Sequence, residues 1–188
     1  MPDHCANKLT VYGPDSEVIL FMEKAQGQEP DWPLSEVSRK KGLTKNPPAK
    51  SDFCFNALYP VPKEILSKGF DKTGRRWCDN HWGTKWDAYD LKIVRGENEV
   101  TFLFTTAWEP PKSLLQKVAG DFPELSFALS YSEESGGRFL FCNGKFIGEE
   151  EEEGNEGGAD DDDDDENWEE TQTFYATHEE WVEGLKMG

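Results

Sequence analysis

Two runs of β-branched and aromatic residues lie in the stretch Tyr89-Asp-Leu-Lys-Ile-Val-Arg-Gly-Glu-Asn-Glu-Val-Thr-Phe-Leu-Phe-Thr-Thr-Ala-Trp108. The first run ends at Val94 and the second begins at Glu99. The residues between them, Arg95-Gly-Glu-Asn, have the composition of a hairpin turn. The stretch therefore predicts two antiparallel strands that are neighbours in a sheet.

Two segments on either side of this hairpin have the spacing of amphipathic helices. The first runs from Asp15 to Ala25 and ends before Gly27, a residue that favours helix termination. The second follows Pro110 and Pro111, which suit the first turn of a helix. Its apolar stripe consists of Leu114, Leu115, Val118, Ala119 and Phe122.

Further strands are predicted where apolar and polar residues alternate. These segments are residues 8–12, 53–59, 125–131 and 138–147, the last with a turn at Asn143-Gly144. A short helical turn is expected at residues 63–68. The resulting order is strand, helix, three strands, helix and two strands. It predicts an α+β fold: a ferredoxin-like antiparallel sheet with two main helices on one face, plus insertions.

Composition divides the chain into three parts. Residues 1–148 form the predicted ferredoxin-like domain, and residues 28–51, rich in Pro, Lys and Gly, form an inserted loop. Residues 149–170 form an acidic low-complexity segment without Lys or Arg. In residues 171–188 the apolar pattern returns, which predicts a strand and a short helix that pack on the domain.

Charge is the strongest compositional signal in the 188-residue chain. It contains 38 Asp and Glu against 20 Lys and Arg, which gives a formal charge of -18. More than a third of the acidic residues lie in residues 149–170, so the rest of the chain is nearly balanced. Such an excess repels phosphates and anionic lipids, which argues against direct binding to nucleic acid or membrane.

The cysteines and the N-terminal residues show no pattern typical of a disulfide framework, a metal site or a secreted protein. The four cysteines, Cys5, Cys54, Cys78 and Cys142, form no CxxC pair, so free thiols are expected. The N-terminal residues lack a signal-peptide pattern, and no apolar run approaches the length of a membrane span. We expect a cytoplasmic protein.

Several strings along the chain resemble the YubB family of ferredoxin-like domains from bacterial plasmids and phages. They begin at Asn80 (NHWGTKWDAYD), Phe104 (FTTAWEPP), Phe122 (FPEL), Phe55 (FNALYPVP) and Cys5 (CANKLTV). The resemblance covers most of residues 5–147 but not the acidic segment. It implies an accessory protein of a mobile genetic element, acting in a bacterial cell. By analogy, such a protein interferes with host defence or regulation.

The cluster of tryptophans before the hairpin is a candidate ligand groove. Trp82, Trp86 and Tyr89 are spaced four and three residues apart, so their rings either meet in a helical turn or line a groove. Such a groove could stack a base or grip a peptide, with Lys85 contacting an anion. The alternative is a structural corner in which Thr84 and Asp87 cap turns. The groove residues predicted are Asn80, His81, Trp82, Lys85, Trp86, Asp87, Tyr89 and Trp108.

Catalytic and metal sites are not indicated by the residue patterns. Cys78 and His81 lie three positions apart but lack the further ligands of a tetrahedral metal site. His4 and Cys5 are neighbours in a predicted strand, so their side chains point to opposite faces. No phosphate loop, HExxH or GxSxG motif occurs. We expect no enzyme activity, no metal and no cofactor.

The acidic segment has three interpretations. Its carboxylates could imitate nucleic-acid phosphates and occupy the basic groove of a bacterial defence protein. They could instead solubilise a linker, or bind calcium weakly, although the spacing of a defined calcium loop is absent. The predicted contact residues are Glu149, Glu150, Glu151, Glu152, Glu153, Asp160, Asp161, Asp162, Asp163, Asp164, Asp165 and Glu166.

The sequence therefore favours a non-catalytic phage or plasmid protein that binds and inhibits a host protein through its acidic segment. The second hypothesis is a binder of a nucleotide or signalling molecule that uses the Trp-rich groove. An enzyme acting on nucleotides is the third, and no residue set supports it.

Overall fold

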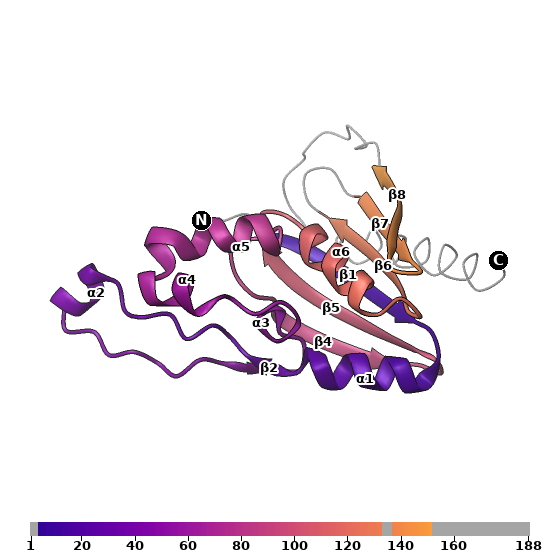
Figure 1. Ribbon diagram of the computed structural model, residues 1–188, viewed down its shortest axis with the longest axis horizontal. Coiled ribbons are helices and arrows are strands. Elements are labelled where there is room, and N and C mark those ends of the chain that lie inside the picture. The colour runs from indigo at the N-terminus through magenta and orange to yellow at the C-terminus, as the bar shows by residue number, and fades with distance from the viewer. Residues whose placement is uncertain (1–3, 133–136, 152–188) are drawn as a thin grey trace, which may run out of the picture.

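A six-stranded antiparallel sheet forms the centre of the protein (Figure 1). The computed structural model of the chain describes residues 4–132 and 137–151. Across the sheet the strands follow the order β4-β5-β1-β6-β7-β8. Their bounds are β1 His4–Tyr12, β4 Tyr89–Arg95, β5 Glu99–Ala107, β6 Ser126–Ser132, β7 Gly137–Cys142 and β8 Lys145–Glu151.

Four of these strands and two helices have the ferredoxin-like topology that the sequence predicts. The chain runs β1, α1 (Asp15–Ala25), β4, β5, α6 (Lys112–Asp121), β6, and β1 lies between β5 and β6 in the sheet. Leu9 of β1 pairs with Phe102 on one side and with Leu129 on the other. The predicted hairpin of residues 89–108 is confirmed as β4 and β5.

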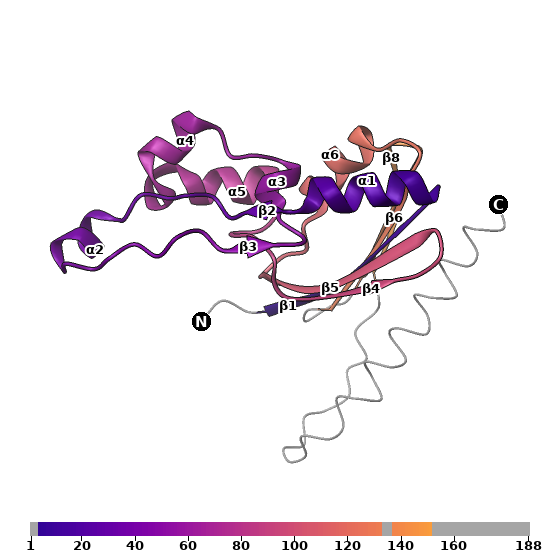
Figure 2. The same cartoon turned by 90° about the horizontal axis from the view of Figure 1, so that it is seen from below.

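The two main helices, α1 and α6, lie on one face of the sheet (Figure 2). The ring of Phe21 in α1 lies 5.4–5.9 Å from those of Phe102, Phe122 and Phe127, each in an edge-on arrangement. Each such ring taken out of water contributes about 2–3 kcal/mol to the free energy of folding. This aromatic cluster therefore holds the two main helices on the sheet.

The prediction of a second strand at residues 53–59 is wrong. The structure has the helix α3 (Phe55–Leu58) there, and the side chains of Phe53, Phe55 and Leu58 are all buried. Alternating apolar residues fit either a strand or a short buried helix. The difference is decided by Asp87, whose carboxylate accepts backbone N–H groups at the start of α3.

The predicted insertion is an arm, by which we mean residues 27–51. Two short strands, β2 (Gly27–Gln28) and β3 (Lys50–Ser51), pair at its base. The arm extends away from the sheet and carries the helix α2 (Glu36–Lys40) near its tip (Figure 1). Glu36 of α2 contacts Lys72 at 3.4 Å, so the arm also lies against the segment that follows α3.

That following segment contains three helical stretches. It consists of α4 (Lys63–Lys68), where the sequence predicts a helical turn, a π-helical turn η1 (Phe70–Gly74) and α5 (Arg75–His81). A π-helical turn is rare and often occurs at functional sites. Here it places Phe70 opposite the arm.

The last predicted strand, residues 138–147, is divided into β7 and β8. The predicted turn joins them, with Asn143 and Gly144 at φ angles of 50° and 72°. Backbone pairing continues to Glu151, so three of the predicted acidic contact residues belong to the edge strand β8. The others, from Glu152 onward, lie outside the described residues, as does the predicted C-terminal element. Among the described residues, no helix is long and apolar enough to span a membrane.

Candidate functional site

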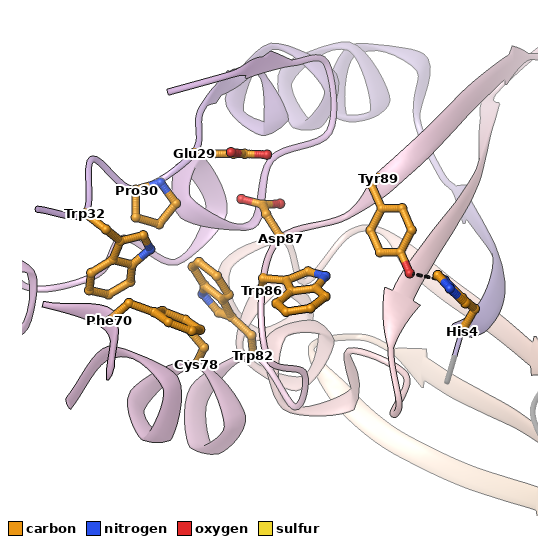
Figure 3. A pocket seen from close by; sticks show the side chains of 10 residues that line it. All are labelled: His4, Glu29, Pro30, Trp32, Phe70, Cys78, Trp82, Trp86, Asp87 and Tyr89. Carbon is orange, nitrogen blue, oxygen red and sulfur yellow. Dashed lines mark hydrogen bonds between the residues drawn. The ribbon is translucent and has the colours of Figure 1, made fainter. Parts of the chain in front are cut away.

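A cavity of about 520 Å³ lies at one end of the sheet, between the arm and the segment from η1 to β4. Its walls come from three separate parts of the chain, as Figure 3 shows. The lining residues are His4, Glu29, Pro30, Trp32, Phe70, Cys78, Trp82, Trp86, Asp87 and Tyr89. Five of the ten side chains are Trp, Tyr or Phe, so the wall is largely aromatic.

The arm contributes one aromatic wall through Trp32. The indole of Trp32 lies edge-on to the ring of Phe70, with 5.5 Å between the ring centroids. It also lies directly over Gly74, where an added Cβ would come within 2.6 Å of the indole. The absence of a side chain at Gly74 therefore allows the arm to rest on η1.

Trp82 supplies a second wall and is fixed in place. It is 1% exposed, and its Nε1 donates a hydrogen bond to the carbonyl of Tyr59 at 3.0 Å. Its indole lies edge-on to the phenyl ring of Phe55 and to the indole of Trp77. Trp82 is thus mainly a core residue with one surface on the cavity.

Asp87 is a buried carboxylate on the same wall. Its oxygens accept backbone N–H groups from Phe55 at 2.7 Å, Ala88 at 2.9 Å and Asn56 at 3.3 Å, and the thiol of Cys54 at 3.3 Å. Burial raises the pKa of Asp87 to about 6, although these hydrogen bonds lower it. At neutral pH the cavity wall therefore carries a negative charge.

Tyr89 and His4 close the cavity at the sheet end. The Tyr89 hydroxyl and His4 Nδ1 are 2.6 Å apart, and one of them donates to the other. Burial raises the pKa of Tyr89, with a smaller effect from the nearby charge of Asp90. The contact joins the start of β4 to the start of β1.

A column of alternating cations and indoles lies beside the cavity. The ammonium of Lys85 lies 4.4 Å from the ring of Trp86 and 4.9 Å from that of Trp108. The guanidinium of Arg75 lies 5.1 Å from Trp108. Trp108 has a φ of 69°, which is rare for a bulky residue and turns its indole toward this column.

The electrostatics of the cavity are negative. Glu29 and Asp87 contribute carboxylates, and among the described residues that line the cavity none is Lys or Arg. Lys85 contacts Trp86 but does not line the cavity, so its ammonium lies outside. The site therefore combines aromatic faces with negative charge.

The thiols near the cavity are poor nucleophiles. Burial is the main cause that raises the pKa of Cys54 and of Cys78 to about 12, and nearby carboxylates add to it. Only a thiolate attacks or binds a metal well. Among the described residues, no group of three or more His, Cys, Asp and Glu side chains is placed to hold a metal ion.

The structure brings together four of the eight predicted groove residues. Trp82, Trp86, Asp87 and Tyr89 line the cavity. They do so from an irregular segment, because α5 ends at His81. Of the two arrangements that the spacing allows, the helical turn is absent from this stretch, and whether the cavity binds a ligand stays a prediction.

The other four predicted groove residues lie outside the cavity wall. Asn80 is exposed on α5. His81 stacks on Trp77 at 4.3 Å, and its Nδ1 lies 2.8 Å from the Trp77 carbonyl. Lys85 and Trp108 belong to the column of cations and indoles.

Sequence reasoning missed the part of the cavity that the arm and η1 provide. Glu29, Pro30 and Trp32 lie in a segment expected to be an inserted loop, and Phe70 lies before the tryptophan cluster. One signal was present: Trp32 lies between Pro30 and Pro33 in an otherwise polar stretch. A large aromatic residue in such a stretch indicates docking against the body of the protein.

A sequence model of the ferredoxin-like domain in Api92-like proteins matches residues 81–178, more than half of the chain. The chain belongs to this family. The match begins at the end of α5 and includes Trp82, Trp86, Asp87 and Tyr89. It also continues through the acidic segment, which therefore lies within the extent of the Api92-like domain.

The crystal structure of the protein Api92 from Yersinia pseudotuberculosis is similar in fold. It superposes with a TM-score of 0.64 at 11% identity and covers 86% of this chain and 100% of the Api92 chain. A comparison with curated proteins found no match. The ferredoxin-like fold implied by the YubB resemblance is thus confirmed, whereas the YubB family itself stays a prediction.

Proposed function

We propose that this protein is a non-catalytic binder that holds a small organic molecule in the aromatic cavity. The observation that carries the proposal is a cavity of about 520 Å³ with aromatic walls from three parts of the chain. Small-molecule sites are typically concave and mostly apolar, with a few fixed polar groups. Asp87, Glu29 and the pair of Tyr89 and His4 are the polar groups here.

The titratable groups support binding in preference to catalysis. A thiol with a pKa of about 12, as at Cys78, is protonated at neutral pH. Both oxygens of Asp87 are occupied by hydrogen bonds that hold α3. The Cys78 thiol is therefore not a nucleophile at neutral pH, and the Asp87 carboxylate already serves the backbone of α3.

The charges of the cavity restrict the ligand. A phosphate inside it would meet Glu29 and Asp87 with no Lys or Arg among the described lining residues. The nucleotide hypothesis therefore narrows to ligands whose buried part carries no phosphate. Flat rings suit the walls, because Trp32 and Trp86 are only partly buried and offer their indoles.

Tryptophan fluorescence tests this proposal with a panel of nucleosides, nucleotides, aromatic acids and organic cations. We expect saturable quenching by at least one compound, lost in Trp86→Ala and retained in Trp108→Ala. The two tryptophans form a matched pair, because both contact Lys85 but only Trp86 lines the cavity. If no compound binds, or both variants bind equally, the cavity is not the site.

A second proposed function concerns the acidic segment. The Api92-like match extends to residue 178, and backbone pairing of β8 continues to Glu151. The acidic segment therefore lies inside the matched range, which supports a role for it in the function of the domain. In this second proposal, a YubB-like protein of a phage or plasmid inhibits a bacterial host defence protein with a basic groove, inside the host cytoplasm.

Deletion of residues 152–166 tests the second function and leaves β8 intact. Capture of a basic partner from bacterial lysate should be lost in the deletion and should weaken steeply from low to moderate salt. Equal capture by the full-length protein and by the deletion variant would exclude the acidic segment as the contact. Loss of capture in Trp86→Ala would instead assign it to the cavity.

A further inference from the structure

We propose that the group held in the cavity is an organic cation, an alkylated ammonium. This inference rests on the ligand-binding function proposed above and adds the chemical class of the ligand. It is carried by the combination of aromatic faces and carboxylates that line one cavity.

The aromatic walls have the composition of a cation-binding cage. The rings that line the cavity come from the arm, η1, the segment before β4 and the first residue of β4 (Figure 3): Trp32, Phe70, Trp82, Trp86 and Tyr89. A cation over an aromatic face is attracted by the negative charge density of the ring, and indole is the most effective ring. Alkylated ammonium groups suit such cages, because their methyl groups pack on the rings while their charge needs no hydrogen bonds.

The protein already uses this interaction next to the cavity. Lys85 lies over Trp86 and Trp108, and Arg75 lies over the same Trp108. Trp86 is shared, since it contacts Lys85 and also lines the cavity. The indoles in this region are therefore oriented with their faces toward positive charge.

The carboxylates provide the counter-charge. In the part of the chain that the structure describes, neither Asp87 nor Glu29 forms an ion pair with Lys, Arg or His. Glu29 is exposed, whereas Asp87 is buried, and the hydrogen bonds to Asp87 stabilise its carboxylate without neutralising its charge. Figure 3 shows both carboxylates on the same side of the cavity, above the indoles of Trp82 and Trp86. A cation between these carboxylates and the indoles would be attracted by the negative charge of the carboxylates and by the faces of the rings.

An isosteric pair of ligands separates charge from shape. Choline carries a trimethylammonium group, and its carbon analogue, dimethylbutanol, has a tert-butyl group of the same shape without charge. We expect choline to quench tryptophan fluorescence with an affinity at least about ten-fold higher than that of the analogue. Equal affinities would contradict the proposal that the ligand is a cation, and the proposal that the cavity binds a ligand would remain.

Two single-charge variants give a second, independent test. Glu29→Gln should weaken choline binding by about three-fold, because it removes a carboxylate from the wall. Lys85→Gln should strengthen it, because it removes a positive charge behind Trp86. The Glu29 side chain is exposed and forms no hydrogen bond or ion pair with the part of the chain that the structure describes, so its replacement leaves the fold intact. The opposite pattern would contradict a cation held next to Glu29 and Trp86.

A third experiment distinguishes the two possible sources of the ammonium group, a protein side chain and a small molecule. A peptide that contains trimethyllysine, its unmethylated counterpart and free choline are titrated in parallel. Tighter binding of the methylated peptide assigns the cation to a protein side chain, and equal binding of choline assigns it to a small molecule. If choline and both peptides fail while a neutral compound binds at Trp86, the cation is wrong. If no compound of either panel binds, the proposed function fails as well.

Discussion

The carboxylate of Asp87 accepts the backbone N–H of Phe55 at 2.7 Å, across 32 residues of chain. Asn56 and Ala88 donate to the same carboxylate. The residue at the N-cap of α3, Cys54, makes no capping hydrogen bond to the helix with its own side chain. Asp87 therefore performs the capping from a distant segment and joins α3 to the wall of the cavity.

Replacing Asp87 by Ala should destabilise the fold by about 3 kcal/mol. Three backbone N–H groups lose their acceptor, and a buried group without a partner costs about 1–3 kcal/mol. Urea unfolding measures the change. Asp52→Ala is the matched control, because Asp52 is exposed nearby, and it should change stability by less than about 0.5 kcal/mol. Similar effects in the two variants would contradict the capping role.

The stability of the protein should depend on pH through Asp87. Its pKa is about 6 in the folded protein and 3.8 ordinarily, so the folded state retains a proton that the unfolded state has lost. The contribution of Asp87 to stability therefore falls as pH rises from about 4 to about 6 and is constant above that range. Relative to Asp87→Asn, the wild type should lose about 2 kcal/mol between about pH 4.5 and about pH 7. A constant difference between the two proteins would show that burial does not raise this pKa.

Gly74→Ala should disturb the cavity without unfolding the protein. The added Cβ would come within 2.6 Å of the far edge of the Trp32 indole, which must shift. Because the backbone at Gly74 is helical, with φ of -63°, the substitution is otherwise tolerated. Near-ultraviolet circular dichroism should change, while the sheet and helix signal in the far ultraviolet stays.

Gly120→Ala in α6 is the control for this variant. An added Cβ at Gly120 meets nothing within 4 Å. The substitution should leave the aromatic signal unchanged and raise stability by about 0.5–1 kcal/mol, because Ala favours a helix over Gly. Identical near-ultraviolet spectra for Gly74→Ala and the wild type would show that Trp32 does not rest on Gly74.

The four thiols should differ in reactivity. Cys142 is half-buried, whereas Cys5, Cys54 and Cys78 are buried, and the pKa values of Cys54 and Cys78 are raised to about 12. We expect an aromatic disulfide reagent to modify Cys142 in the folded protein and the other three only after unfolding. Rapid modification of Cys78 would mean that the cavity exposes this thiol.

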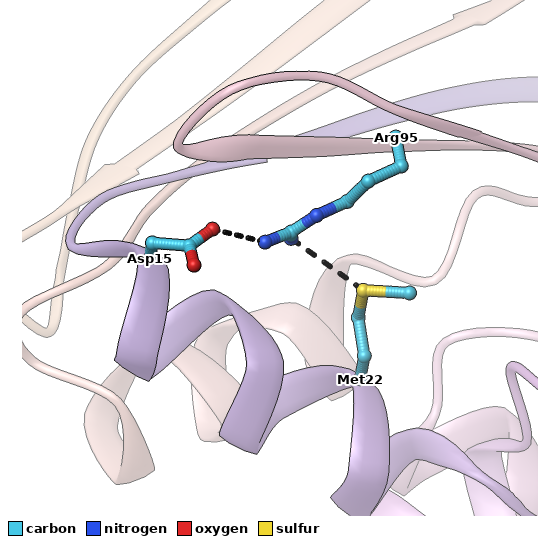
Figure 4. Close-up of polar contacts among 3 residues, drawn as sticks. All are labelled: Asp15, Met22 and Arg95. Atoms are coloured by element: carbon cyan, nitrogen blue, oxygen red, sulfur yellow. Dashed lines mark hydrogen bonds and ion pairs between the residues drawn. The ribbon is translucent and has the colours of Figure 1, made fainter.

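Local pattern was sufficient to predict the sheet and its two main helices. β1, β4, β5 and β6 alternate with the correct period, and α1 and α6 have apolar stripes. Residues 53–59 were assigned wrongly because the acceptor that makes them helical, Asp87, is remote in sequence. Asp15 shows the same limit: at the start of α1 it pairs with Arg95 of β4, and Arg95 also contacts Met22 (Figure 4).

The candidate site could be predicted only where its residues are consecutive. Trp82, Trp86, Asp87 and Tyr89 belong to one short stretch, so a groove was one of the arrangements that the sequence allowed for them. Trp32 and Phe70 come from segments that meet only after folding. The opposing wall of the cavity was therefore beyond any local pattern.

The arm has a consequence for how occupancy could be sensed. One wall of the cavity, Trp32, belongs to the arm, and the facing walls belong to the domain body. A molecule that contacts both the arm and the domain body links them, and part of its binding free energy stabilises the contact between them. The arm also carries an exposed basic stretch at Arg39, Lys40 and Lys41. A ligand in the cavity should therefore slow the cleavage of the arm by trypsin at this basic stretch, which is not part of the cavity wall.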